Sequence, residues 1–265
     1  YGWLEEWIDT REKAGDIHIE TGTSFDNPFN AEGYADDLLS NLDEDAAQIY
    51  VYGKPGRIGH DYFFYAYRPD INDYPVEYDP GDLVHATLDF NVGRMSCGFA
   101  HVWGQGDDKQ IGYFDECVLL GERGNTEEMA EEIVTRYGRE NVLVTCDASG
   151  KARKTSGLSD VQTLERHGLK VRYKRSNPRI RKSQLLVNGL LARRKVFINP
   201  AKCPVMKKDL NKVKQKDDFE IEKKVADLTH MSDGLRYLCD HEFPNWLDRS
   251  TREKYKEIKF GERIG

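Results

Sequence analysis

Residues 83–90, Leu-Val-His-Ala-Thr-Leu-Asp-Phe, form a mostly apolar stretch that carries Asp89 near its end. Residues 141–147, Asn-Val-Leu-Val-Thr-Cys-Asp, repeat this arrangement and end on Asp147. Short runs of β-branched and apolar residues bounded by turn residues are typical of buried strands. We therefore predict two strands, each of which presents a carboxylate at its C-terminal end.

The surrounding patterns predict the rest of an α/β domain. Asn125, followed three residues later by Glu128, is a capping-box-like helix start. Further strands are predicted at residues 96–103, 110–120 and 170–173, and helices at 126–137, 159–167, 178–191 and 226–239. This order is typical of a ribonuclease H-like domain, which has a mixed central sheet flanked by helices. A strand that returns through a helix lies parallel to its partner, so residues 141–146 should pair with residues 83–90.

The first 82 residues differ from the remainder. Turn-forming residues at 22–28, a short acidic helix at 31–42 and aromatic-rich pieces at 48–52 and 61–67 indicate an N-terminal extension. Residues 74–82 resemble a linker. We predict a domain boundary there, with an extension over residues 1–82 and the ribonuclease H-like domain over residues 83–265.

Charge is distributed unevenly over the 265 residues, whose net charge is −7. Residues 1–82 carry 19 acidic against 5 basic side chains, whereas residues 151–216 carry 20 basic against 3 acidic ones. Because charges act over about 8 Å at physiological salt, the local basic block matters more than the total. It predicts either a solvated basic surface or a track for DNA phosphates, whose candidate residues are Lys151, Arg153, Lys154, Arg179, Arg181 and Lys182.

Other features exclude whole classes of protein. No apolar run approaches the roughly 18 residues of a membrane span, so no membrane partner is expected. The five cysteines are scattered and form no C-x-x-C pair, which favours a reducing compartment over a disulfide or zinc framework.

A third aspartate, Asp233, lies on the predicted helix at 226–239, with His230 on the same helix face. Asp89 and Asp147 would lie on neighbouring strands about 4.8 Å apart, where two carboxylates repel unless a cation lies between them. We therefore predict a catalytic site of Asp89, Asp147, Asp233 and His230, in which the aspartates bind Mg²⁺ or Mn²⁺. Two such ions about 3.5–4 Å apart can activate water and stabilise the leaving oxygen of a phosphodiester.

Two assignments stay open at this stage. His230 can bind metal, bind a substrate phosphate or relay a proton. Asp115 and Glu116 on the third strand are weaker metal-site candidates and are otherwise solvent-facing or structural.

The ordered motifs resemble the large terminase subunits of tailed bacteriophages. The matching segments are Thr23-Ser24-Phe25-Asp26-Asn27-Pro28, Thr87-Leu88-Asp89-Phe90-Asn91-Val92, Asp147-Ala148-Ser149-Gly150, Ser176-Asn177-Pro178 and His230-Met231-Ser232-Asp233-Gly234-Leu235-Arg236-Tyr237. The resemblance departs at Gly234, where alanine is commoner.

This resemblance implies an enzyme that packages viral DNA and cuts the double-stranded concatemer in the cytoplasm of the infected bacterium. It implies that Asp89, Asp147 and Asp233 hold the metal with His230 beside them, and that the portal protein and the small terminase subunit are partners. Residues 1–82 would be the end of the ATPase region and a linker. The chain has no Walker A or B motif, so no ATP hydrolysis is expected of it.

Three alternatives remain. A recombinase or Holliday-junction resolvase would share the fold and the acidic site. A non-catalytic DNA-binding or portal-docking module would use the aspartates structurally. Residues 1–80 would, in a further reading, serve chiefly as a contact for the portal or the small subunit.

Overall fold

The computed structural model describes residues 7, 10–12, 14–18, 20, 22–41, 51–53, 62–91, 93–152, 157–216, 221, 228–244 and 246. The chain divides into two compact units, Tyr1–Asp61 and Tyr62–Gly265. In the first unit, helix α2 (Tyr34–Asn41) corresponds to the predicted acidic helix. Asp26 accepts hydrogen bonds from the backbone N–H and the hydroxyl of Thr23, which closes the predicted turn.

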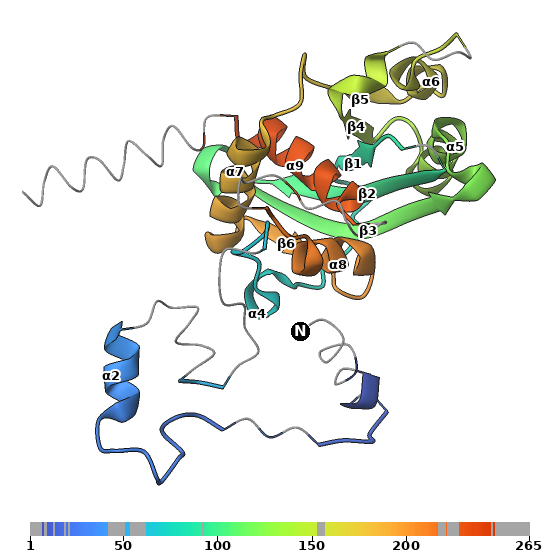
Figure 1. Ribbon diagram of the computed structural model, residues 1–265. Coiled ribbons are helices and arrows are strands. Elements are labelled where there is room, and N and C mark those ends of the chain that lie inside the picture. The colour runs from blue at the N-terminus through green and yellow to red at the C-terminus, as the bar shows by residue number, and fades with distance from the viewer. Residues whose placement is uncertain are drawn as a thin grey trace, which may run out of the picture. The chain divides into compact units, whose positions relative to one another are not determined.

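Within the described residues, the second unit is built on one six-stranded mixed sheet (Figure 1). Its strands are β1 (Val84–Asp89), β2 (Arg94–Trp103), β3 (Gln110–Leu120), β4 (Val142–Cys146), β5 (Lys170–Arg172) and β6 (Val196–Ile198). They are ordered β5-β4-β1-β2-β3-β6. β2 runs antiparallel to β1 and β3, and the other neighbouring pairs are parallel. The predicted parallel pairing of β1 with β4 is confirmed.

Helices cover both faces of this sheet. They are α4 (Pro69–Asn72), α5 (Thr126–Tyr137), α6 (Asp160–Arg166), α7 (Ile180–Ala192), α8 (Pro204–Lys212) and α9 (His230–Glu242), with 3₁₀ turns η1 (Gly106–Asp108), η2 (Gly121–Arg123) and η3 (Ala148–Lys151). One apolar cluster joins α5 and α6 to the sheet, and a second joins α7, α8 and α9 to it. Figure 1 shows α9 along the sheet with α7 beside it.

The alternation of side chains along β1 decides which face receives Asp89. Val84, Ala86 and Leu88 belong to the cluster under α5 and α6. The intervening side chains therefore point to the opposite face, which α9 covers. A Cβ atom on Gly234 of α9 would lie 3.0 Å from the Thr87 hydroxyl oxygen, so glycine at this position permits the close approach of α9 to β1.

The structure differs from the sequence-based predictions at the domain boundary, at one strand that was not predicted and at the start of one helix. The compact unit begins at Tyr62 instead of residue 83, because Phe63, Phe64 and Tyr67 are buried in the core with α7 and α9. Strand β6 was not predicted. Helix α9 begins at His230, since Thr229 has a φ of 88° and breaks the helical path; residues 226 and 227 lie outside the described part of the chain.

Candidate active site

Asp89 and Asp147 lie at the same end of the sheet. Their preceding residues, Leu88 and Cys146, are partners in the parallel β1–β4 register. Asp147 follows β4 and caps η3, where its Oδ1 atom accepts hydrogen bonds from the backbone N–H groups of Ser149 at 2.9 Å and Gly150 at 3.1 Å. The two predicted strand-end carboxylates are thus brought to one edge.

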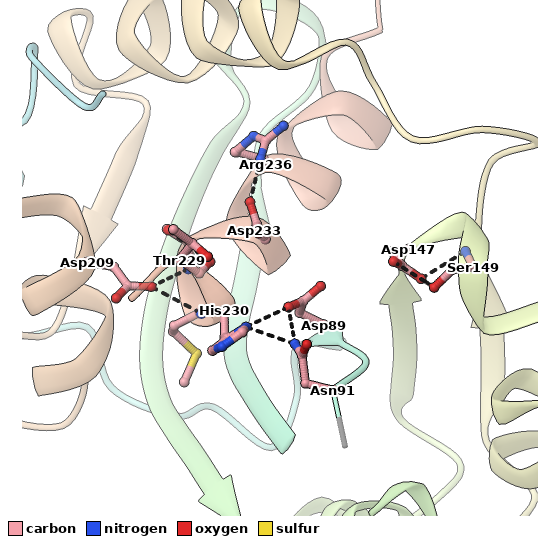
Figure 2. Close-up of polar contacts among 11 residues, drawn as sticks. Asp89, Asn91, Asp147, Ser149, Asp209, Thr229, His230, Asp233 and Arg236 are labelled. Atoms are coloured by element: carbon pink, nitrogen blue, oxygen red, sulfur yellow. Dashed lines mark hydrogen bonds and ion pairs between the residues drawn. The ribbon is translucent and has the colours of Figure 1, made fainter. Parts of the chain in front are cut away.

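Helix α9 adds His230 to this edge. The Nδ1 atom of His230 lies 3.0 Å from Oδ2 of Asp89 (Figure 2). Asn91 supplies its Nδ2 atom 2.6 Å from the same carboxylate oxygen and 2.8 Å from His230 Nδ1. The hydrogen bond to Asp89 is the main cause that raises the pKa of His230 above its usual value. Asn91, two residues after Asp89, was not predicted.

Asp233 lies in the first turn of α9 and pairs with Arg236 of the next turn. Arg236 is buried, its Nε donates to the Ser183 hydroxyl of α7 at 2.9 Å, and its guanidinium lies 5.5 Å from the centre of the Phe63 ring. Arg236 therefore ties the Asp233 carboxylate to α7. Sequence reasoning missed this residue, although its spacing of three from Asp233 places both on one helix face.

Tyr237 of α9 has a hydroxyl group whose pKa is affected by the charges of all three aspartates. Burial raises the pKa of its hydroxyl, and the charges of Asp233, Asp89 and Asp147 raise it further. Tyr237 follows Asp233 by four residues and so shares its helix face.

The donor chemistry fits a hard divalent cation, but the carboxylates are not gathered around one point. The aspartates are 8%, 8% and 9% exposed in chain order, and carboxylate oxygens are the ligands that Mg²⁺ and Mn²⁺ prefer. Among the described residues, no group of three or more His, Cys, Asp or Glu side chains is close enough to hold a metal. In Figure 2 the carboxylates of Asp147 and Asp233 contact Ser149 and Arg236. Both would have to turn to share an ion.

The predicted DNA-binding residues fall on two connected segments. Lys151 of η3 donates to the backbone oxygen of Arg175 at 2.8 Å, and the Ala148 N–H donates to Asn177 at 2.8 Å. The loop before α7 is thereby fixed beside Asp147. Arg179, Arg181 and Lys182 are exposed where α7 begins, while Arg153 and Lys154 lie outside the described residues.

A pocket opens between this loop, the end of β4 and α9. Its lining includes Lys174, Asn177, Tyr237 and His241. Its lining also includes Cys146, the last residue of β4, which directly precedes Asp147.

Asp115 and Glu116 have structural partners instead. Asp115 accepts hydrogen bonds from Arg136 at 2.8 Å and from the Tyr137 hydroxyl at 2.6 Å, both on α5. Glu116 accepts from the backbone N–H groups of Val205 at 2.6 Å and Met206 at 2.9 Å, so it caps α8. Neither contact involves the three aspartates.

Comparison with known protein families identifies the family to which the chain belongs. The family model described as the terminase RNaseH-like domain matches residues 86–240, more than half of the sequence. The chain belongs to this terminase family. The match runs from β1 into α9 and so includes Asp89, Asp147, His230 and Asp233. The predicted ribonuclease H-like fold and the terminase resemblance are confirmed.

Two solved terminase structures share the fold. The large terminase of the thermophilic bacteriophage D6E has a TM-score of 0.55 at 14% identity, over 89% of this chain and 57% of that one. The nuclease domain of the P22 large terminase has a TM-score of 0.53 at 13% identity, over 71% of this chain and 95% of that domain. This terminase chain thus spans little more than half of the D6E protein.

No curated protein matches the sequence significantly. Within the described residues, no helix has the length and apolarity needed to cross a membrane.

Proposed function

We propose that this terminase chain is a metal-dependent DNA endonuclease that cuts concatemeric double-stranded DNA during viral DNA packaging. The observation that carries the proposal is the position of Asp89 and Asp147 after paired residues of parallel strands, with Asp233 supplied by α9. The P22 domain of the same fold is described as a nuclease, which supports the same activity here.

The carboxylates of Asp89, Asp147 and Asp233 would hold two Mg²⁺ or Mn²⁺ ions. A bound divalent ion lowers the pKa of its water and stabilises negative charge on a phosphodiester oxygen. The chain's own groups orient these ligands. His230 and Asn91 fix one oxygen of Asp89, Ser149 and Gly150 bond Asp147, and Arg236 bonds Asp233. Hydrogen-bonded groups behind metal ligands typically raise metal affinity or activity 10–100-fold.

Substrate DNA would be held through its phosphates. Lys151, Arg179, Arg181 and Lys182 present positive charge beside Asp147, and Arg153 and Lys154 would extend this surface along the chain. Contacts of this kind position a duplex without reading its sequence. Cleavage would therefore show little sequence preference and would weaken as salt rises.

The remaining assignments follow the whole large terminase and are proposals for this chain. The residues before the compact unit that begins at Tyr62 would be the end of the ATPase region with a linker. The portal protein and the small subunit would be partners, and the host cytoplasm would be the site of action. The likeness to the D6E large terminase over 89% of this chain supports a place within a longer packaging enzyme.

The test is plasmid cleavage in Mn²⁺ by the chain and its Asp89→Ala and Asp147→Ala variants, with folding checked by circular dichroism. We expect the parent to linearise and degrade plasmid, and both folded variants to lose activity at least a hundredfold. If both variants cut as well as the parent, the proposed site is wrong. A parent that binds DNA but never cuts would favour the docking module, and a strong preference for four-way junctions would favour the resolvase.

A further inference from the structure

Asp209, on α8, meets the N-terminus of α9. Its Oδ2 atom accepts hydrogen bonds from the backbone N–H groups of Met231 at 3.2 Å and Ser232 at 3.0 Å (Figure 2). The side chain has 0% exposure, and burial raises its pKa. A buried carboxylate is costly unless hydrogen bonds satisfy it. The two backbone donors satisfy Oδ2, whereas Oδ1 is also buried and has no hydrogen-bond partner among the described residues.

Helix α9 needs this outside acceptor because its own N-cap residue does not supply one. The first N–H groups of a helix have no partner within the helix, and an N-cap side chain normally accepts one of them. Thr229 occupies the N-cap position with φ 88° and ψ −29°, and its side chain makes no capping hydrogen bond. A β-branched residue is strained in this left-handed conformation, which surrounding contacts must therefore impose.

The turn that Asp209 caps also carries His230 and Asp233, two residues of the candidate active site. His230, whose Nδ1 lies 3.0 Å from Asp89, directly precedes the two capped amides, and Asp233 directly follows them. The Asp233 N–H donates to the Thr229 oxygen at 2.7 Å, which closes the same turn. A shift of this turn would therefore move both side chains relative to β1.

Helix α8 is itself fixed to the sheet. Glu116 of β3 accepts from the first-turn N–H groups of Val205 and Met206, and Asp209 lies one turn further along α8. The partly buried carboxylate of Glu116 thus holds α8 on β3, and the buried carboxylate of Asp209 holds α9 on α8. This continuous series of contacts runs from the sheet to the His230–Asp89 pair.

We propose that Asp209 is a positioning residue of the terminase nuclease site, which holds the first turn of α9 so that His230 and Asp233 are aligned with Asp89. The inference rests on the proposed function. A purely structural role for Asp209 would change stability alone, whereas a positioning role changes how tightly the site binds its metal.

The experiment compares the parent chain with Asp209→Ala, Asp209→Asn and Asp209→Glu. The matched control is Asn72→Ala, which removes another buried polar side chain. Asn72 donates to the backbone oxygens of Leu191 and Val196 at 3.1 Å each. It lies beside β6, at the opposite edge of the sheet from β5. Measured quantities are the Kd for Mn²⁺ by titration calorimetry, the Mn²⁺ concentration at half-maximal plasmid cleavage, and Tm.

We expect Asp209→Ala to raise the Kd for Mn²⁺ and the Mn²⁺ concentration at half-maximal cleavage about tenfold each. This lies within the range for groups that hydrogen-bond to metal ligands. Asp209→Asn keeps an acceptor oxygen and should recover most of the affinity. Asp209→Glu keeps the charge but adds a methylene, which displaces the turn and raises the Mn²⁺ values several-fold. Asn72→Ala should lower Tm and leave both Mn²⁺ values within twofold of the parent.

Parent-like Mn²⁺ values in folded Asp209→Ala would overturn the inference, as would an equal shift in Asn72→Ala. If Asp209→Ala does not fold, Asp209→Glu decides by the same criterion. A parent chain that neither binds Mn²⁺ nor cuts DNA would instead refute the proposed function, whatever the Asp209 variants do.

Discussion

His230 Nδ1 lies 3.0 Å from Asp89 Oδ2 and joins the first turn of α9 to the last residue of β1. The two residues are 141 positions apart, so only the folded chain brings them together. Asn91 contacts both, so three side chains bond one another where β1 meets α9.

Replacing His230 should impair cleavage more than folding. His230→Ala removes the partner that orients the Asp89 carboxylate, so we expect a 10–100-fold loss of plasmid cleavage in Mn²⁺ with a native circular dichroism spectrum. The control is His167→Ala, which removes a histidine that lies 2.8 Å from Glu127 on the other helical layer. Cleavage by His230→Ala within twofold of the His167→Ala control would show that His230 does not support the site.

Replacing Arg236 should destabilise the protein strongly. Arg236→Ala leaves the buried Asp233 carboxylate without its guanidinium, and removal of one partner of a buried pair costs about 3–5 kcal/mol. The matched control is Arg166→Ala, whose pair with Glu127 is exposed and should contribute less than about 1 kcal/mol. Urea unfolding measures both, and equal losses in the two variants would contradict the structural role of Arg236.

Glu116 predicts a pH dependence of stability. Burial raises its pKa from 4.5 to about 7, so the folded protein binds this proton more tightly than the unfolded chain does. Its contribution to the free energy of unfolding is therefore full below about pH 4.5 and is lost as pH rises through about 7. Glu116→Gln removes the titration.

The free energy of unfolding of the parent minus that of Glu116→Gln should accordingly fall between pH 5 and 8, by on the order of 2 kcal/mol. Urea unfolding at each pH measures it. A difference that stays constant or rises over this range would show that burial does not raise the pKa of the Glu116 carboxyl group.

The basic start of α7 predicts a salt dependence of DNA binding. Each phosphate contact contributes about 0.9 to the slope of log affinity against log salt, so Arg179→Ala, Arg181→Ala and Lys182→Ala should each reduce the slope by about 1. Lys208→Ala, which removes an exposed lysine on α8, should leave it unchanged. Fluorescence anisotropy with a DNA duplex between 50 and 200 mM salt checks this. An unchanged slope in all three variants would refute DNA binding by the basic start of α7.

The core of the fold was predictable because local pattern and topology agree. The strands that end at Asp89 and Asp147 are apolar runs with turn residues after them, and a helical crossover places such strands in parallel. Strand β6 was missed because it has three residues, Val196–Ile198, and follows the basic segment 193–195. Its pairing with β3 is a tertiary effect that short-range pattern does not contain.

The site was predictable only in part, for the same reason. Aspartates at strand ends can be seen in sequence, whereas the residues that orient them are recognised by contact. Asp209 lies 23 positions from Ser232, and nothing in its neighbourhood marks it as a helix cap. Phe63 and Tyr67 belong to a segment that was predicted as an extension. Their place in the core could not be predicted because their burial depends on α7 and α9.

The most direct test is a crystal structure of the chain soaked in Mn²⁺, with the ion located by anomalous scattering. We predict density that bridges the carboxylates of Asp89 and Asp147, with the Asp233 side chain turned from Arg236 towards it. Carboxylates that keep their separate contacts to His230, Ser149 and Arg236, with no ion between them at saturating Mn²⁺, would contradict a metal-dependent nuclease site at this edge of the sheet.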